Sequence, residues 1–198
     1  LDAIHVNLLG GKAYYAASEL NRQRRAPWGD SVPTRDRPLV IGCDFNFNPA
    51  PCVWMVGQVG PALYSPTGVF WGSCIHWFGE ISDTQISSTD MAYKLIAAYP
   101  DFFYQIFGDV SGGMGTTSNA GEADYNHIGN VMNDSGCNYS IDYFQNDEIK
   151  ANPKVRSRVE NMNSRFKNAM SEIHQTYDPV GCPLFDGDMK KVGWKPTN

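Results

Sequence analysis

Apolar residues from Pro38 onward fall into short runs, each ending at glycine, proline or a polar residue. Residues 39–44 form the first run, residues 53–59 form the second, and a third stretch divides into residues 68–71 and 75–81. Aromatic and β-branched side chains fill these runs, which favours extended backbone over helix. The pattern predicts three consecutive antiparallel strands, the last of them either one strand or a hairpin.

The spacing of apolar residues changes to a helical repeat after residue 87. The stretch Ser87-Ser88-Thr89-Asp90 offers N-cap chemistry, Met91 and Leu95 follow at helical spacing, and Pro100 stops the helix. Strands and helices then alternate. We expect strands at residues 103–109, 139–144 and 172–177, and helices at residues 122–132, from Asn152-Pro153 to Phe166, and at residues 182–192.

This order of elements predicts one α/β domain at residues 38–198, built on a mixed sheet with helices on both faces. Residues 1–37 are interpreted as a lead-in or linker from a preceding domain, because the segment after Asn21 is polar and the first residue is Leu1. No run of eighteen apolar residues occurs, so we expect no membrane-spanning segment. The five cysteines form no C-x-x-C motif, which disfavours a disulfide framework and a zinc site.

Two of the predicted strands end at an aspartate. Residues 39–44 finish at Asp44 and residues 103–109 at Asp109, and a polar turn follows each. One such residue alone could simply start a turn, but two on neighbouring strands would place two carboxylates side by side. Adjacent carboxylates without a nearby base favour a hard divalent cation, Mg²⁺ or Mn²⁺. The pair therefore predicts a metal site at one edge of the sheet.

Charge is distributed unevenly along the chain. The net charge is −5, yet residues 38–149 contain twelve acidic residues and a single basic residue, Lys94. Residues 150–167 contain six basic residues and one acidic residue, and residues 12–37 contain six and three. This distribution fits a metal centre beside a surface that binds a polyanion. A solvated charged helix explains the basic segment equally well.

Four short motifs occur in the order in which a known family carries them. They are Gly42-Cys43-Asp44-Phe45-Asn46 with Asn48-Pro49, Phe107-Gly108-Asp109-Val110-Ser111-Gly112, Asn152-Pro153-Lys154-Val155-Arg156-Ser157-Arg158-Val159 with Asn163, and Cys182-Pro183-Leu184-Phe185 leading to Asp188 and Trp194. With these motifs the chain resembles, from about Gly10 onward, the nuclease domain of the large terminase subunit of tailed bacteriophages. That family has a ribonuclease H-like fold and cuts concatemeric viral DNA during genome packaging.

The resemblance implies metal-dependent cleavage of DNA, in which two ions, Mg²⁺ or Mn²⁺, clamp the scissile phosphate. Asp44 would bridge both ions, and Asp109 would hold one of them. The packaging ATPase of the family would belong to a preceding domain, since this sequence has no Walker A loop.

The third metal ligand is less defined by the resemblance. Asp188 would supply it, but Asp186 is an alternative, and so is an acid beyond Asn198, because many relatives carry their last acid in a more C-terminal helix. Glu80 is expected to end the third strand, either near the metal or facing solvent. Asp124 is expected to cap a helix or to face water.

The resemblance also implies that double-stranded DNA, the portal and the small terminase subunit are partners, in the cytoplasm of the infected bacterial host. Two other interpretations stay open: another ribonuclease H-like nuclease of the resolvase or transposase type, or a non-catalytic DNA- or capsid-binding module with a decayed site.

The basic residues are expected to have two roles. Arg158 is expected to brace the fold by pairing with an acid. The candidate phosphate contacts are Lys154, Arg156, Arg165 and Lys167, with Arg22, Arg24 and Arg25 as further candidates.

Overall fold

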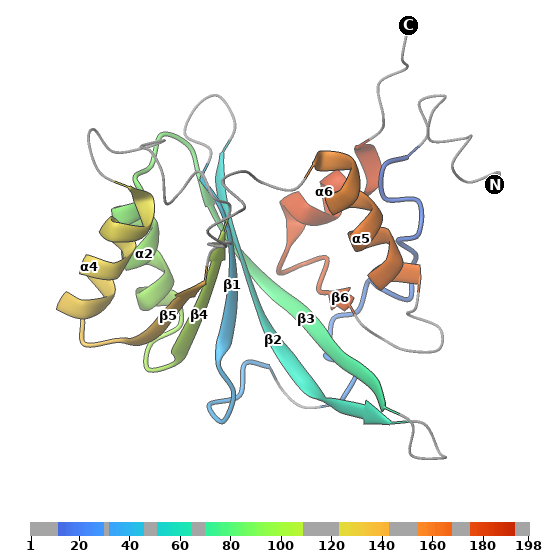
Figure 1. Ribbon diagram of the computed structural model, residues 1–198, viewed down its shortest axis with the longest axis horizontal. Helices are drawn as coiled ribbons and strands as arrows, with labels where there is room; N and C mark the ends of the chain where they lie inside the picture. Colours follow the sequence, from blue (N-terminus) through green and yellow to red (C-terminus); the bar gives the residue numbers. More distant parts are fainter. Residues whose placement is uncertain are drawn as a thin grey trace, which may run out of the picture. The chain divides into compact units, whose positions relative to one another are not determined.

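The computed structural model of the chain describes residues 12–29, 32–45, 51–64, 70–108, 123–142, 154–167 and 175–192. These residues form a mixed six-stranded sheet in the order β5-β4-β1-β2-β3-β6, with four helices (Figure 1). The strands are β1 (Leu39–Asp44), β2 (Cys52–Tyr64), β3 (Phe70–Asp83), β4 (Phe103–Gly108), β5 (Asn138–Asp142) and β6 (Gln175–Tyr177). The helices are α2 (Ser88–Ala98), α4 (Asp124–Asp134), α5 (Val155–Lys167) and α6 (Pro183–Lys191).

The chain divides into two compact units. The β1 unit contains residues 33–59 and 79–152, and the β6 unit contains residues 1–32, 60–78 and 153–198. Strands β2 and β3 contribute residues to both units.

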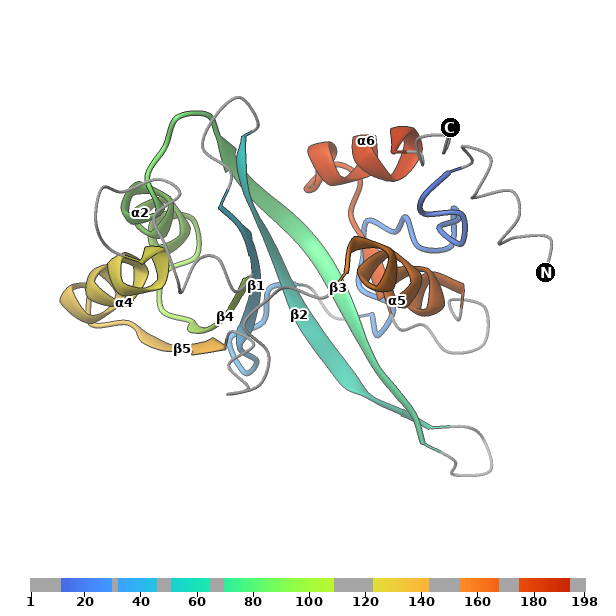
Figure 2. The same cartoon turned by 45° about the horizontal axis from the view of Figure 1, so that its top comes forward.

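Strand β1 is the centre of the β1 unit. It pairs in parallel with β4 and antiparallel with β2, so that Ile41 lies opposite both Ile106 and Val56, and all three side chains are fully buried. Strand β5 continues the parallel part of the sheet beyond β4. Helices α2 and α4 lie side by side in both views (Figures 1 and 2), and Met91 and Ile128 are among their fully buried residues. A strand with buried neighbours on each side needs a continuous apolar run, which is what residues 39–41 provide.

The β6 unit joins the two ends of the described chain. Strand β6 pairs in parallel with β3, and Phe166, Tyr177 and Met189 form its buried core. The side chain of Asn163 on α5 donates to the backbone oxygen of Ala13 at 2.8 Å. The segment that the sequence presents as a lead-in is therefore bound to α5 from residue 13 onward, while a preceding ATPase domain stays a prediction.

The boundaries of several elements differ from the predicted ones. The third apolar stretch forms one strand, β3, because the extended backbone continues through Gly72 and Ser73 beside β2, while residues 68 and 69 lie outside the described residues. Helix α4 begins and ends two residues later than expected. Asn152-Pro153 and residues 172–174 lie outside the described residues. No helix in the described part of the chain has the length and apolar character needed to cross a membrane.

Candidate functional site

Asp44 is the last residue of β1, and its side chain is exposed. In the parallel ladder between β1 and β4, Cys43 lies opposite Gly108, so the two strands finish at the same edge of the sheet. Asp109, the second predicted metal ligand, follows Gly108 in the sequence and lies outside the described residues. The structure thus describes one of the two strand-end carboxylates and the backbone on which the other follows.

Three residues with little or no side-chain freedom meet at this edge, and we call Phe45, Gly108 and Tyr125 the strand-end cluster. The Phe45 and Tyr125 rings meet edge to face with their centroids 5.3 Å apart, and both residues are buried. Gly108 lies directly against them: a Cβ at this position would overlap the Tyr125 Oη and would lie 2.8 Å from the Phe45 Cε2. The ends of β1 and β4 and the first turn of α4 are therefore in direct contact.

Asp124, the first residue of α4, is fully buried rather than facing water. The Ser88 hydroxyl donates a hydrogen bond of 2.7 Å to its Oδ1, which ties the start of α4 to the start of α2. A carboxylate in the first turn of a helix also interacts favourably with the helix dipole. Sequence reasoning missed this pair because Ser88 and Asp124 are 36 residues apart and no local pattern links them.

Two cysteines neighbour Asp44: Cys43 precedes it in the sequence, and Cys52 contacts its backbone. The Cys52 thiol donates to the backbone oxygen of Asp44 at 3.2 Å. Burial, followed by the charge of Asp44, raises the pKa of Cys52 to about 12, and burial raises the pKa of Cys43 as well. The negative charges of Asp44 and Asp124 add to the rise in the pKa of both thiols.

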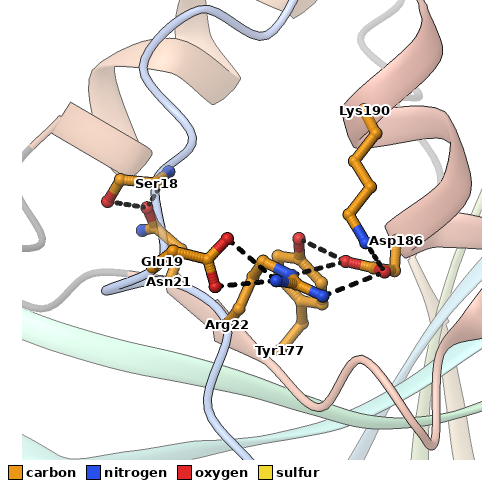
Figure 3. Close-up of polar contacts among 7 residues, drawn as sticks. All are labelled: Ser18, Glu19, Asn21, Arg22, Tyr177, Asp186 and Lys190. Atoms are coloured by element: carbon orange, nitrogen blue, oxygen red, sulfur yellow. Dashed lines mark hydrogen bonds and ion pairs between the residues drawn. The ribbon is translucent and has the colours of Figure 1, made fainter.

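Asp186, one alternative for the third metal ligand, forms hydrogen bonds with residues of the β6 unit through both carboxylate oxygens (Figure 3). Its Oδ1 accepts from Arg22 Nε at 2.7 Å and from Tyr177 Oη at 3.0 Å, and its Oδ2 accepts from Lys190 Nζ at 2.6 Å and from Arg22 Nη2 at 3.3 Å. Burial opposes ionisation, but the hydrogen bonds from Arg22, Lys190 and Tyr177 prevail and lower the pKa of Asp186 to about 2. Asp186 acts as the anchor of the N-terminal segment through Arg22.

Asp188, the preferred third ligand, is exposed on α6 in the β6 unit. Burial, and to a lesser extent the charge of Asp188, raises the pKa of Tyr14 in the same unit.

Glu80 does not end the third strand as expected, because β3 continues to Asp83. The side chain of Glu80 is half-buried. Within the described ranges, no three histidine, cysteine or acidic side chains form a metal-binding group. The whole ligand set, Asp44 included, stays a prediction.

The candidate phosphate contacts fall into two groups. Lys154, Arg156 and Arg165 are exposed at or on α5, and Arg156 forms an ion pair of 3.0 Å with Glu160 one turn away. The side chain of Lys167 lies outside the described part of the chain. Arg22, a further candidate, is instead held by Asp186 and Glu19. Arg158, which we expected to brace the fold, is exposed; Arg22 has that role in the β6 unit.

Comparison with known proteins identifies the fold. No family model and no curated protein sequence match the chain. Among solved structures, the nuclease domain of the P22 large terminase matches over 91% of this chain and 79% of that one, with a TM-score of 0.54 and 9% sequence identity. The chain has a terminase nuclease-like fold. The ribonuclease H-like mixed sheet expected from the order of the elements is thereby confirmed, and at this identity the likeness carries the fold alone.

Proposed function

We propose that this chain is a metal-dependent DNA endonuclease, the nuclease part of a large terminase subunit that cuts concatemeric viral DNA during genome packaging. One observation carries the proposal: in a fold like that of the P22 terminase nuclease, Asp44 ends the central strand β1 at the edge where the parallel strand β4 also ends. This edge is where a sheet with such connections presents side chains from different strands to one ligand.

Asp44 and Asp109 would hold two divalent ions, Mg²⁺ or Mn²⁺. The carboxylate of Asp44 suits a hard cation that prefers oxygen ligands, and it is exposed at the strand end. Asp109 is bonded to Gly108, which lies opposite Cys43, and the proposal places its carboxylate beside that of Asp44. Two ions about 3.5–4 Å apart would supply the charge that activates water and stabilises the leaving oxygen. Asp188 or an acid beyond Asn198 would complete the ligands.

The remaining residues would bind and orient the DNA. Lys154, Arg156, Arg165 and Lys167 would contact phosphate groups, which carry no base information, so the isolated chain would bind duplex DNA without sequence preference. A preceding ATPase domain, the portal and the small terminase subunit would bring the DNA to this site in the cytoplasm of the infected host.

A plasmid-nicking assay of the full chain tests the proposal. Nicking should occur with Mn²⁺ or Mg²⁺ and stop with EDTA. Asp44→Asn should reduce it to background while the fold survives, because the amide keeps the shape but removes the charge that attracts the ions. Asp134→Asn, which removes one charge from an exposed acid at the end of α4, serves as the matched control and should nick normally.

The same assay separates the alternatives. Retained nicking by Asp44→Asn would exclude Asp44 from the mechanism. DNA or capsid binding without any cleavage would support a non-catalytic module, and cleavage confined to branched junctions would support a resolvase.

A further inference from the structure

We propose that the strand-end cluster, Phe45, Gly108 and Tyr125, is a positioning device that sets the separation of the carboxylates at the ends of β1 and β4. The proposal rests on the proposed nuclease function and deepens it. It assigns to α4, which is not among the expected metal-binding elements, a role in the geometry of the reaction.

The first argument is the place of the cluster in the sequence. Phe45 directly follows Asp44, Gly108 directly precedes Asp109, and Tyr125 directly follows Asp124. The three residues touch one another, so any change in their packing displaces the backbone that carries each of these acids.

The second argument is the close contact at Gly108. Its backbone does not require the freedom of glycine, because its φ lies outside the left-handed region. Its requirement is space: a methyl group would overlap the Tyr125 hydroxyl and would lie 2.8 Å from the Phe45 ring, whereas carbon atoms in contact prefer about 3.5–4.0 Å. Glycine therefore allows β4 to approach α4 and β1 more closely than any other residue would.

The third argument is the rigidity of the surrounding contacts. Phe45 also meets the fully buried Trp54 edge to face, with the ring centroids 6.4 Å apart. Asp124, the residue before Tyr125, accepts the hydrogen bond from Ser88 on α2, which ties the backbone at the start of α4 to α2. Because neither ring can retreat freely, an added methyl group would move the strand ends rather than the rings. Catalytic groups need placement within about 0.5 Å, and a shift of about 1 Å can reduce a rate roughly 100-fold.

A matched pair of substitutions separates positioning from ordinary packing. Gly108→Ala places a methyl group against Tyr125 Oη, and Gly79→Ala on β3 of the same unit places one equally close to Tyr99 Oη, although only the methyl group at Gly108 also meets a second ring, that of Phe45. Both should lower stability. At equal concentrations of folded protein, Gly108→Ala should nick plasmid about 100-fold more slowly and need more Mn²⁺ for half-maximal activity. Gly79→Ala should match the wild type in both respects, and DNA binding should be unchanged in all three proteins.

A suppressor adds a second readout. Tyr125→Phe removes the hydroxyl that the methyl group would strike, so the double variant Gly108→Ala/Tyr125→Phe should recover part of the lost rate and of the Mn²⁺ affinity. If Gly108→Ala does not fold, Phe45→Leu tests the same cluster against Phe102→Leu, which truncates another buried ring of the β1 unit. Phe45→Leu should slow nicking and raise the Mn²⁺ requirement, and Phe102→Leu should do neither.

The outcomes distinguish this inference from the proposed function. Suppose that the wild type nicks DNA in an Asp44-dependent manner. If Gly108→Ala is then as active per folded molecule as Gly79→Ala, or Phe45→Leu is as active as Phe102→Leu, the positioning role is wrong but the proposed nuclease function stands. If the wild type does not nick DNA with either metal, both proposals are wrong.

Discussion

At the scale of single residues, His76 is a fully buried titratable group that the proposed chemistry does not use. Its Nδ1 lies 2.8 Å from Thr176 Oγ1, and the Trp28 ring meets it edge to face. In the part of the chain that the structure describes, its Nε2 has no hydrogen-bond partner. Burial lowers the pKa of His76 to about 4, although the charge of Asp178 opposes this shift. The imidazole is therefore neutral in the folded protein at neutral pH.

This buried imidazole makes stability depend on pH. The unfolded chain binds a proton at His76 near pH 6.5, but the folded chain does so only near pH 4. The neutral His76 side chain therefore makes its full contribution to the free energy of unfolding above pH 6.5. This contribution declines as the pH falls to about 4, by up to about 3 kcal/mol. Urea unfolding of the wild type and His76→Gln between pH 4 and 8 measures this. The variant should be less stable at pH 7.5 but should lose less stability on acidification. Equal pH slopes would show that His76 does not titrate as described.

At the scale of elements, two adjacent serines at the start of α2 have different roles. Ser87 is the N-cap, and its hydroxyl accepts from the Asp90 amide at 3.1 Å at the surface. Ser88 is buried and donates to the buried Asp124 carboxylate of α4. The first contact is local to one helix, and the second connects two helices.

The two serines should therefore differ in their contribution to stability. Ser87→Ala should cost about 1 kcal/mol, the usual value for a lost N-cap. Ser88→Ala should cost about 2 kcal/mol, because it removes a donor from a buried carboxylate. Chemical denaturation of both variants at pH 7 measures the difference. A smaller loss for Ser88→Ala than for Ser87→Ala would contradict the assigned roles.

The same pair shows what the sequence can predict at this scale. The boundaries of β1 and an N-cap within residues 87–90 follow from neighbouring residues, so the apolar run and the capping pattern were sufficient to predict them. The contact between Ser88 and Asp124 spans 36 residues, and the one between Arg22 and Asp186 spans 164. Such pairs depend on the tertiary fold, which is why Asp124 was expected to cap a helix or to face water and Asp186 was an alternative metal ligand.

At the scale of the whole molecule, order and spacing carried more information than residue identity. The match to the P22 terminase nuclease covers most of the chain at only 9% identity. A mixed sheet requires apolar strands and helical faces in the right order but tolerates many different side chains in them. The order of elements therefore predicted the fold, whereas the predicted ligand set of Asp44, Asp109 and Asp188 depends on a few side chains and stays a prediction.

DNA binding also belongs to this scale, because the chain is acidic overall and its affinity must come from its basic segments. Arg156→Ala/Arg165→Ala should weaken duplex binding and reduce the log–log salt slope by about 2, since each lost phosphate contact removes about 0.9. Fluorescence anisotropy across a salt series measures this. Arg24→Ala/Arg25→Ala removes the same charge from the competing candidate surface and should leave the slope unchanged. The reverse result would move the DNA-binding surface to the N-terminal arginines.

The central claim is that the ends of β1 and β4 together form a metal-dependent nuclease site. Cleavage of a labelled DNA duplex by the full chain in Mn²⁺, compared among the wild type, Asp44→Asn and Asp109→Asn, tests it most directly. Cleavage by the wild type with loss to background in both variants, each still folded, is the predicted result. Cleavage by Asp109→Asn at the wild-type rate would contradict the account, because the strand end of β4 would then have no part in the reaction.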